Sequence, residues 1–186
     1  MESTIRTVEI MREKALAVQT VFTTVAGLRE AFSYAVELTG SQGGKTLAAP
    51  GLGGEDRREL AALCEQRGIS LVWENLRGHL GRIHTGFTVA QWGIAETGTV
   101  VLDSTSEDVR IASMLSETHI AVVPRSAVKP GAVDLAGELQ EMMKRPGSYV
   151  AFISGASRTA DIERVLTIGV HGPQEFHILI SGENGG

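Results

Sequence analysis

The amino-acid sequence predicts an α/β fold built on a mixed, mostly parallel sheet that is covered on both faces. Short strand-like runs alternate with helical patterns along most of the chain, which is typical of parallel strands joined by helices. Most of these runs are apolar throughout, as expected for strands that are buried on both faces. A tight reversal at Glu96-Thr97-Gly98-Thr99 predicts in addition that part of the sheet is antiparallel.

The predicted elements succeed one another in a regular order. Residues 1–40 have helical periodicity and predict two helices, and the glycine-rich residues 40–44 separate them from the rest of the chain. Strands are then expected at Thr46–Ala49, Ile69–Trp73, Trp92–Glu96, Thr99–Asp103, Ile120–Val123, Tyr149–Ser154 and Phe176–Ile180. Helices are expected at 56–66 and 133–144, with a short one after residue 159. The chain is thereby divided into an N-terminal helical segment (1–40), a single α/β domain (45–181) and a flexible polar tail (182–186).

Composition excludes several classes of protein. Of the 186 residues, 42% are hydrophobic and 21% are charged, which excludes a wholly disordered chain. The net charge of −5 disfavours nucleic acid as a partner. No apolar run approaches the ~20 residues of a membrane span, and residues 1–6 do not have the pattern of a secretory signal. We therefore expect a soluble cytoplasmic protein.

The chain has a single cysteine, Cys64. One thiol permits no intrachain disulfide and cannot build an iron–sulfur cluster or a thiolate zinc site. We therefore expect no cofactor in this chain, and any redox role would need a metal or cofactor from another protein. The remaining carboxylates and histidines show no spacing typical of a metal site.

Ligands of open α/β sheets bind beyond the carboxyl ends of the strands, so the loops at those ends are the candidate sites. The glycine-rich loop 50–54 could approach an anion, but it lacks both nucleotide-binding fingerprints, and a plain turn is favoured. Glu96 could serve as a general base or a nucleophile, and a solvated turn residue is an equal alternative. The basic segment 77–84 is better explained as a solvated loop than as an anion site.

The segment 154–163 is the strongest local signal for a binding site. It runs from a strand through hydroxyl-bearing residues into a predicted helix, which Ser157 or Thr159 could cap and whose first turn Asp161 would suit. Arg158 within this loop is the residue type that recognises a carboxylate or a phosphate through paired hydrogen bonds. A binding role is slightly favoured over a helix cap with solvated charges.

A further candidate is His171, in the segment Gly169-Val170-His171-Gly172-Pro173. Two glycines and a proline fix the path of the backbone around it. A histidine can transfer protons near neutral pH, although a lone histidine more often has only a structural hydrogen bond.

Three segments together resemble the LUD domain family, and within it the lactate utilization protein C type (LutC/YkgG-like). They are residues 86–99, 154–163 and 169–173, which occur in the order and spacing expected of that family. The resemblance covers about residues 45–181. Two positions depart from the family pattern: Gln91 stands where an acidic residue is usual, and Ala156 stands where a proline is usual. The first change weakens any catalytic role for position 91, and the second alters the stiffness of the loop.

The resemblance implies a three-layer α/β/α fold similar to that of the NagB/RpiA/CoA-transferase superfamily. It also implies a place in a cytoplasmic system that oxidises L-lactate to pyruvate, in which partner proteins carry the iron–sulfur clusters and this type does not.

On this basis we expect Arg158, with Ser157 and Thr159, to hold a small carboxylate or another anion. Glu96 and His171 are the expected acid–base groups of the same crevice. Three further residues complete the predicted substrate-binding group: Thr97, Gly98 and Asp161. That these residues converge in space rests only on the analogy between folds.

Two other functions remain open at this point. The chain could be a stand-alone enzyme that acts on a small phosphorylated or CoA-linked substrate, with Glu96 as nucleophile or base. It could also be a purely structural subunit whose loops shape an interface. The sequence leaves the oligomeric state undecided, a homo-oligomer included.

Overall fold

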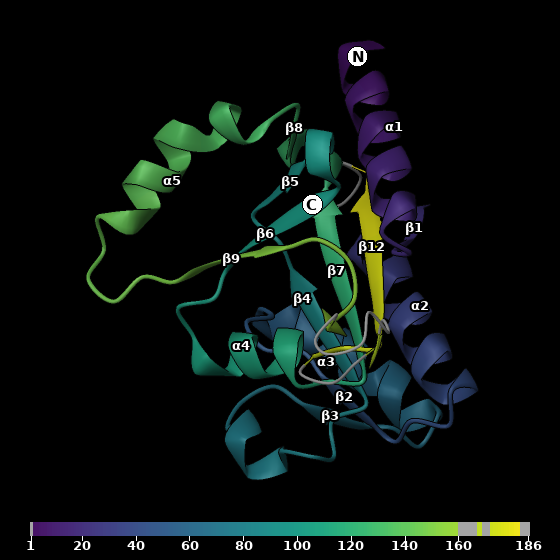
Figure 1. Ribbon diagram of the computed structural model, residues 1–186. Coiled ribbons are helices and arrows are strands. Elements are labelled where there is room, and N and C mark those ends of the chain that lie inside the picture. The colour runs from purple at the N-terminus through teal and green to yellow at the C-terminus, as the bar shows by residue number, and fades with distance from the viewer. Residues whose placement is uncertain (1, 160–166, 169–171, 183–186) are drawn as a thin grey trace.

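The computed structural model describes residues 2–159, 167–168 and 172–182 of the chain. Its centre is a six-stranded sheet in which all paired strands are parallel, in the order β1-β12-β7-β4-β2-β3 (Figure 1). The strands are β1 (Val21–Val25), β12 (Glu175–Ser181), β7 (Thr118–Pro124), β4 (Thr85–Val89), β2 (Thr46–Ala48) and β3 (Ser70–Val72). The α/β fold with a largely parallel sheet is as the sequence predicts.

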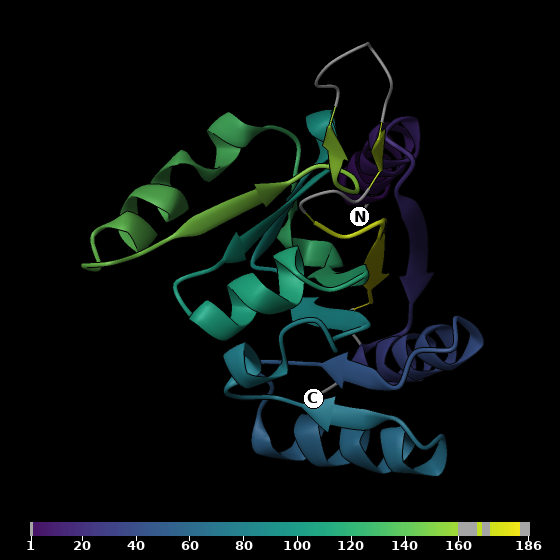
Figure 2. The same cartoon turned by 60° about the horizontal axis from the view of Figure 1, so that its bottom comes forward.

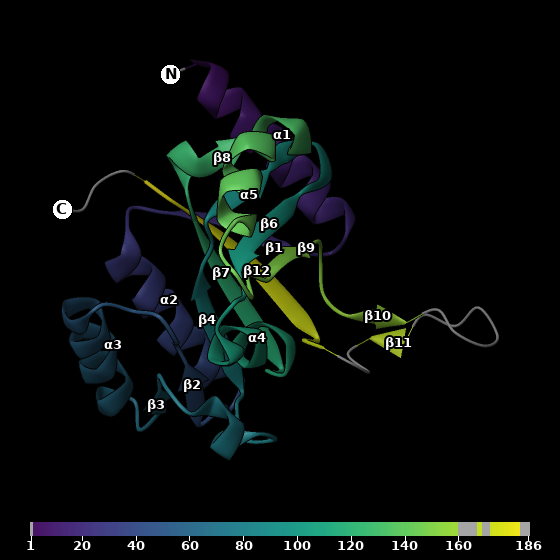
Figure 3. The same ribbon diagram turned by 90° about the vertical axis from the view of Figure 1, so that its left-hand side faces the viewer.

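Two helices cover one face of this sheet, α2 (Leu28–Ser41) and α3 (Gly54–Gln66). Both stand on the same side of the sheet in Figure 3. Phe32 of α2 packs on Phe87 of β4, with ring centroids 5.5 Å apart. Leu60 and Cys64 of α3 join the same buried cluster. The apolar spacing along these helices therefore corresponds to their contact with the sheet.

The opposite face is covered by α1 (Glu2–Ala17), by α4 (Glu107–Met114) and by a second, four-stranded sheet (Figure 3). This mixed sheet has the order β8-β5-β6-β9, with β8 (Val128–Lys129), β5 (Trp92–Ile94), β6 (Thr99–Asp103) and β9 (Val150–Ile153). Met11 of α1, Val100 of β6 and Phe176 of β12 belong to one buried cluster between these elements. The antiparallel pairing of β5 with β6 confirms the reversal predicted around residues 96–99.

The remaining elements are short. A helix, α5 (Ala136–Met143), accompanies β9 and extends with it away from the central sheet (Figure 2). Single 3-10 turns are η1 (Leu76–His79), η2 (Ala95–Thr97), η3 (Arg125–Ala127) and η4 (Ala132–Leu135). Two-residue strands β10 (Arg158–Thr159) and β11 (Thr167–Ile168) pair antiparallel. None of the helices among the described residues is long and apolar enough to cross a membrane.

The N-terminal segment differs from its prediction. The sequence pattern predicts only helices in residues 1–40, but Val21–Val25 form strand β1, which pairs with β12 from Val21–His177 to Val25–Ser181. A five-residue strand between two helices leaves little periodicity of its own. Because α1 and β1 share the core and the sheet of the α/β domain, residues 2–41 are structurally continuous with the rest of the molecule.

Strand β4 and helix α4 also have no counterpart among the predicted elements. At Gly86 in β4 the two elements approach each other so closely that a Cβ atom would overlap with the carbonyl oxygen of Ala112 in α4. Glycine in a strand often marks such a close approach of another backbone. The glycine at this position therefore allows the helix to lie against the sheet.

Candidate functional site

The turn between β5 and β6 rests on the C-terminal part of α1. Gly98 ends η2 in the left-handed region, with φ +63°. A Cβ atom on Gly98 would lie 2.5 Å from the backbone nitrogen of Ala15. The positive φ and the lack of room for a Cβ atom both require glycine at position 98. Gly98 is thus explained by packing against α1, independently of any ligand.

Glu96 lies in the same turn, with an exposed side chain. Its N–H donates to the carbonyl of Pro130 at 3.0 Å. One oxygen of its carboxylate accepts a hydrogen bond of 2.8 Å from the N–H of Ala132. Because Ala132 is the first residue of η4, the carboxylate joins the β5–β6 turn to the segment after β8.

Hydroxyl groups connect this turn with the end of β9. The Oγ1 atoms of Thr97 and Thr99 lie 2.7 Å apart, and that of Thr99 lies 2.6 Å from Oγ of Ser154. Thr97 and Ser154 are exposed. A polar row of three hydroxyls therefore joins the first and second motif segments.

Arg158 is anchored to the loop after α1. Its Nη2 atom donates to the carbonyl of Val18 at 2.6 Å and to the side-chain oxygen of Gln19 at 2.8 Å. Gly155, with φ +83°, passes so close that its Cβ would lie 3.1 Å from the same carbonyl. Within the described residues, Nε and Nη1 of Arg158 make no hydrogen bond. An arginine has five N–H donors, and the three on Nε and Nη1 have no partner in the part of the chain that the structure describes.

Ser157 contacts the third motif segment. Its N–H donates to the carbonyl of Pro173 at 2.9 Å. A Cβ atom on Gly172 would lie 3.0 Å from that of Ser157, so the close approach favours a glycine at position 172. The second and third motif segments therefore meet at Ser157.

The short helix predicted after residue 159 lies outside the described residues, so its proposed cap at Ser157 or Thr159 stays a prediction. Arg158 and Thr159 form strand β10, whose backbone pairs with Ile168 and Thr167 of β11. Asp161 and His171 lie outside the described residues.

The described parts of the three motif segments are thus brought together at the C-terminal end of α1. Gly98, Gly155 and Arg158 each contact residues 14–19. The carboxylate of Glu96 is the exception, because its described partner lies at residue 132. Gly98 and Arg158 meet at this helix end, and Thr97 and Ser157 are adjacent to them in the chain.

Two loops that the sequence favours as plain surface have ordinary structural roles. Gly51 has φ +81°, and Gly53 is the N-cap residue that precedes α3. Arg77, in the basic segment 77–84, pairs with Glu107 at the start of α4. His84 of the same segment shares a hydrogen bond of 2.9 Å with Thr85.

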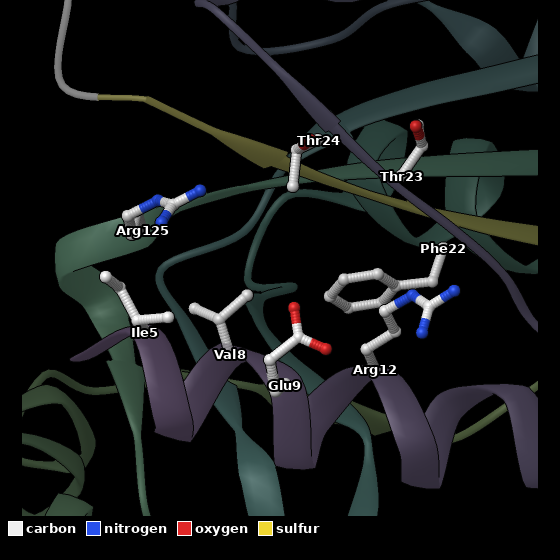
Figure 4. A pocket seen from close by; sticks show the side chains of 8 residues that line it. All are labelled: Ile5, Val8, Glu9, Arg12, Phe22, Thr23, Thr24 and Arg125. Carbon is white, nitrogen blue, oxygen red and sulfur yellow. The ribbon is translucent and has the colours of Figure 1, made fainter. Parts of the chain in front are cut away.

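A cavity of about 310 Å³ lies between α1 and β1, where the sequence predicts no site (Figure 4). It is lined by Ile5, Val8, Glu9, Arg12, Phe22, Thr23, Thr24 and Arg125. The charged residues come from α1 and from the end of β7. Arg125 directly follows the strand-ending Pro124, and this position beyond a strand is the signal that could have identified it.

A second polar region lies at the amino ends of the central strands. His177 is buried; its Nδ1 lies 2.8 Å from the hydroxyl of Tyr34, and its Nε2 lies 3.3 Å from Glu175. Gln42 donates to the same carboxylate at 2.7 Å and accepts from Thr118 at 3.1 Å. We call these five residues the amino-end network. Burial lowers the pKa of His177, although Glu175 opposes the shift.

His119 is fully buried near this network. Its Nε2 shares a hydrogen bond of 2.9 Å with Thr88, and its ring stacks on Phe176 at 5.1 Å. Its Nδ1 has no hydrogen-bond partner among the described residues. Burial, assisted by His177, lowers the pKa of His119 to about 3, so this ring is neutral at physiological pH. In the part of the chain that the structure describes, no three His, Cys, Asp or Glu residues are grouped to hold a metal ion.

The fold and the motif segments define a three-layer α/β protein with a parallel central sheet and a smaller mixed sheet. The LUD domain family matches residues 7–181, and the chain belongs to this family. The match begins within α1, so the helical N-terminal segment lies within the family's domain.

Similar proteins agree with this assignment. Lactate utilization protein C of Anoxybacillus flavithermus is 31% identical over 181 residues, which are 92% of this chain and 79% of that protein. The protein of the same name from Bacillus subtilis is 36% identical over 102 residues, 53% of this chain and 42% of its own length. The uncharacterized protein YkgG of Escherichia coli is 32% identical over 140 residues, which are 69% of this chain and 61% of that protein. Several such matches thus span only about half of the relative.

Among solved structures, a DUF162 family protein from Deinococcus radiodurans has a similar fold. Its TM-score is 0.62 and its sequence identity is 15%, and the superposition covers 96% of this chain and 98% of that one. At this identity the likeness concerns the fold alone.

Proposed function

We propose that this chain is a cluster-free subunit of a cytoplasmic system that oxidises L-lactate to pyruvate. The observation that carries the proposal is the similarity to a protein named lactate utilization protein C over 92% of this chain. Membership of the LUD domain family, over residues 7–181, supports it.

The state of Cys64 supports a role without a cluster of its own. The chain has no second cysteine, and this one is only 1% exposed, within the core beneath α3. Burial raises the pKa of its thiol to about 11. A neutral, inaccessible thiol is a poor metal ligand, because metals bind the thiolate. In the proposal, electrons therefore pass through iron–sulfur clusters of partner proteins.

The proposed role of the motif segments is to bind a small anion, of which lactate is one. Arg158 is held by the end of α1 through Nη2, and its other donors remain for a carboxylate. Ser157, Thr159, Thr97, Gly98 and Asp161 complete the proposed binding group. Glu96 and His171 are the proposed acid–base residues, and a proton transfer by Glu96 requires its carboxylate to leave Ala132.

An exposed apolar surface on β9 and α5 supports the proposed assembly with partners. Val133, Tyr149 and Phe152 are 86%, 62% and 51% exposed, and Met143 of α5 is exposed as well. These residues belong to the part that extends away from the central sheet (Figure 2). Large apolar side chains exposed on one protruding part of a molecule favour a contact surface between proteins. We call these four residues the outer apolar surface.

Removal of the gene from its native host tests the role in lactate use. Growth on L-lactate as sole carbon source should be lost, and growth on pyruvate should be unchanged. A plasmid copy should restore growth, and a copy with Arg158→Ala should not, provided that the variant accumulates to the same level. Unimpaired growth of the deletion strain on L-lactate would contradict the proposal.

Assembly is tested by affinity purification of the tagged chain from the same host. Iron–sulfur proteins should co-purify, detected by their absorbance and iron content. Phe152→Ser should reduce their recovery, whereas Leu80→Ser, at an exposed leucine outside the outer apolar surface, should not. If the chain purifies alone and instead binds a sugar phosphate or an acyl-CoA but not lactate, it is a stand-alone enzyme of another class.

A further inference from the structure

We infer that the cavity between α1 and β1 is a binding site for a small carboxylate that carries a hydroxyl or ammonium group next to its carboxyl group. The site is distinct from the Arg158 segment and does not depend on the proposed role in lactate oxidation. It is defined by Glu9, Arg12, Thr24 and Arg125 around an apolar wall.

The cavity lies near the carboxyl ends of the central strands, where α/β folds of this class bind ligands. Residues Val25, Ser181 and Pro124 are aligned across β1, β12 and β7, so they mark one carboxyl end of the sheet. Arg125 comes immediately after Pro124, and Thr24 precedes Val25 at the same level. Ligands of parallel α/β sheets bind beyond the carboxyl ends of strands. The cavity is therefore bordered by that end of the sheet and by α1.

The two arginines of the cavity differ in burial: Arg12 is exposed and Arg125 is half-buried. Arg12 and Arg125 form no ion pair and no hydrogen bond within the described residues, although the side chain of Arg125 is half-buried. Other arginines are paired, such as Arg29 with Glu59 at 2.5 Å and Arg145 with Asp103 at 2.8 Å. A half-buried guanidinium without a partner loses hydration and gains nothing in return. An anionic ligand would supply the missing partner.

The arrangement of the side chains indicates the chemistry of the ligand. Figure 4 shows the carboxylate of Glu9 directed into the cavity between the two arginines, with Val8 and the ring of Phe22 beside it. The arginines suit a carboxylate, and Glu9 accepts a hydrogen bond from a neighbouring hydroxyl or ammonium group. Val8 and Phe22 suit a short alkyl group. A dianion such as phosphate is disfavoured because Glu9 would repel it.

The volume fits a small molecule. About 310 Å³ lies at the lower end of the range of ligand sites in proteins. A small 2-hydroxy or 2-amino carboxylate with a short side chain would occupy it, whereas a nucleotide or an acyl-CoA would not.

Calorimetric titration of the full chain tests the inference. The probes are L-lactate, L-alanine, acetate and inorganic phosphate, and each is titrated into the natural chain and into Arg158→Ala, so that any site at Arg158 is removed from the second series. We expect L-lactate or L-alanine to bind more tightly than acetate, and phosphate to bind least. Binding in the cavity should persist in Arg158→Ala.

Three variants locate the site. Arg125→Gln and Arg12→Gln should weaken binding at least tenfold, whereas Arg6→Gln, on the same helix but not lining the cavity, should leave it unchanged. Glu9→Gln should reduce the preference for L-lactate over acetate and should improve the binding of phosphate. Circular dichroism and the melting temperature check that each variant is folded. The inference fails if none of the carboxylates binds to Arg158→Ala, if Arg125→Gln binds as the natural chain does, or if phosphate binds best.

Discussion

The amino-end network and the cavity between α1 and β1 are both rich in polar groups, but they differ in how those groups are satisfied. In the network, each ring nitrogen of His177 has a partner, and Gln42 joins Glu175 to Thr118. In the cavity, Arg12 and Arg125 have no partner among the described residues. Buried polar groups that satisfy one another stabilise a fold, whereas charges left without partners are available to a ligand. The first region should therefore respond to mutation through stability, and the second through binding.

The largest expected effect is that of acid on the buried histidines. His119 has a pKa of about 3 in the folded chain, against about 6.5 in an unfolded one. Below pH 6.5 the unfolded state binds a proton that the folded state rejects, so stability falls as the pH falls. The free energy of unfolding should fall by roughly 1 kcal/mol for each pH unit within this range.

Chemical denaturation between about pH 7 and pH 4 measures this loss. His119→Phe removes the titrating ring, and its stability should depend less steeply on pH over that interval. His79→Gln, at a half-buried histidine on the 3-10 turn η1, is the control and should keep the natural slope. Equal slopes for the natural chain and His119→Phe would show that His119 is not responsible.

The next effect is the loss of one hydroxyl from the amino-end network. Tyr34→Phe leaves Nδ1 of His177 without its partner in a buried position. A buried polar atom that loses its hydrogen bond costs ~1–3 kcal/mol. Urea denaturation at neutral pH should show this decrease. Tyr149→Phe, at an exposed tyrosine, should change stability little, and an equal decrease in both variants would contradict the network's role.

A smaller effect is expected at the cavity. Arg12→Gln and Arg125→Gln remove charges that have no partner in the described structure, so each should change the melting temperature by less than about 2 °C. Thermal unfolding without added carboxylate measures this. A marked loss of stability in either variant would mean that the arginine has a structural partner, and the contrast between the two regions would no longer hold.

The smallest effect concerns Cys64, whose thiol is buried and has a pKa of about 11. At about pH 8 the native chain should react with a thiol reagent only very slowly, because little thiolate is present and access is blocked. In denaturant one equivalent should react promptly. Rapid reaction of the native chain would show that the core beneath α3 opens readily.

The sequence predicts the fold better than it predicts the candidate site. Long apolar runs such as Ile120–Val123 and Phe176–Ile180 fall within β7 and β12, because a strand buried on both faces needs apolar residues throughout. Val21–Val25 has no such signal, because its place as a strand depends on pairing with β12. The two-residue strand Arg158–Thr159 lies in a predicted polar loop and has no strand signal for the same reason, since its partner strand lies farther along the chain.

The motif segments identify which loops meet but not how their side chains point. Spacing in the sequence cannot show that Arg158 would reach the carbonyl of Val18, or that Glu96 would face Ala132. Arg12 and Arg125 carry no motif, and they line one cavity only because α1 packs against β1 and η3 (Figure 4). Sites of this kind depend on tertiary packing, which a single sequence does not display.

The position of β12 has a consequence for how the molecule is made. This late strand is inserted between β1 and β7, and Val21 pairs with His177. During synthesis, β1 therefore has no strand to pair with until almost all of the domain has left the ribosome. Contacts between residues so distant in sequence slow folding and expose unpaired edges in the meantime. The edge of β7 that later pairs with β12 is likewise without its partner strand until residues 175–181 have been made.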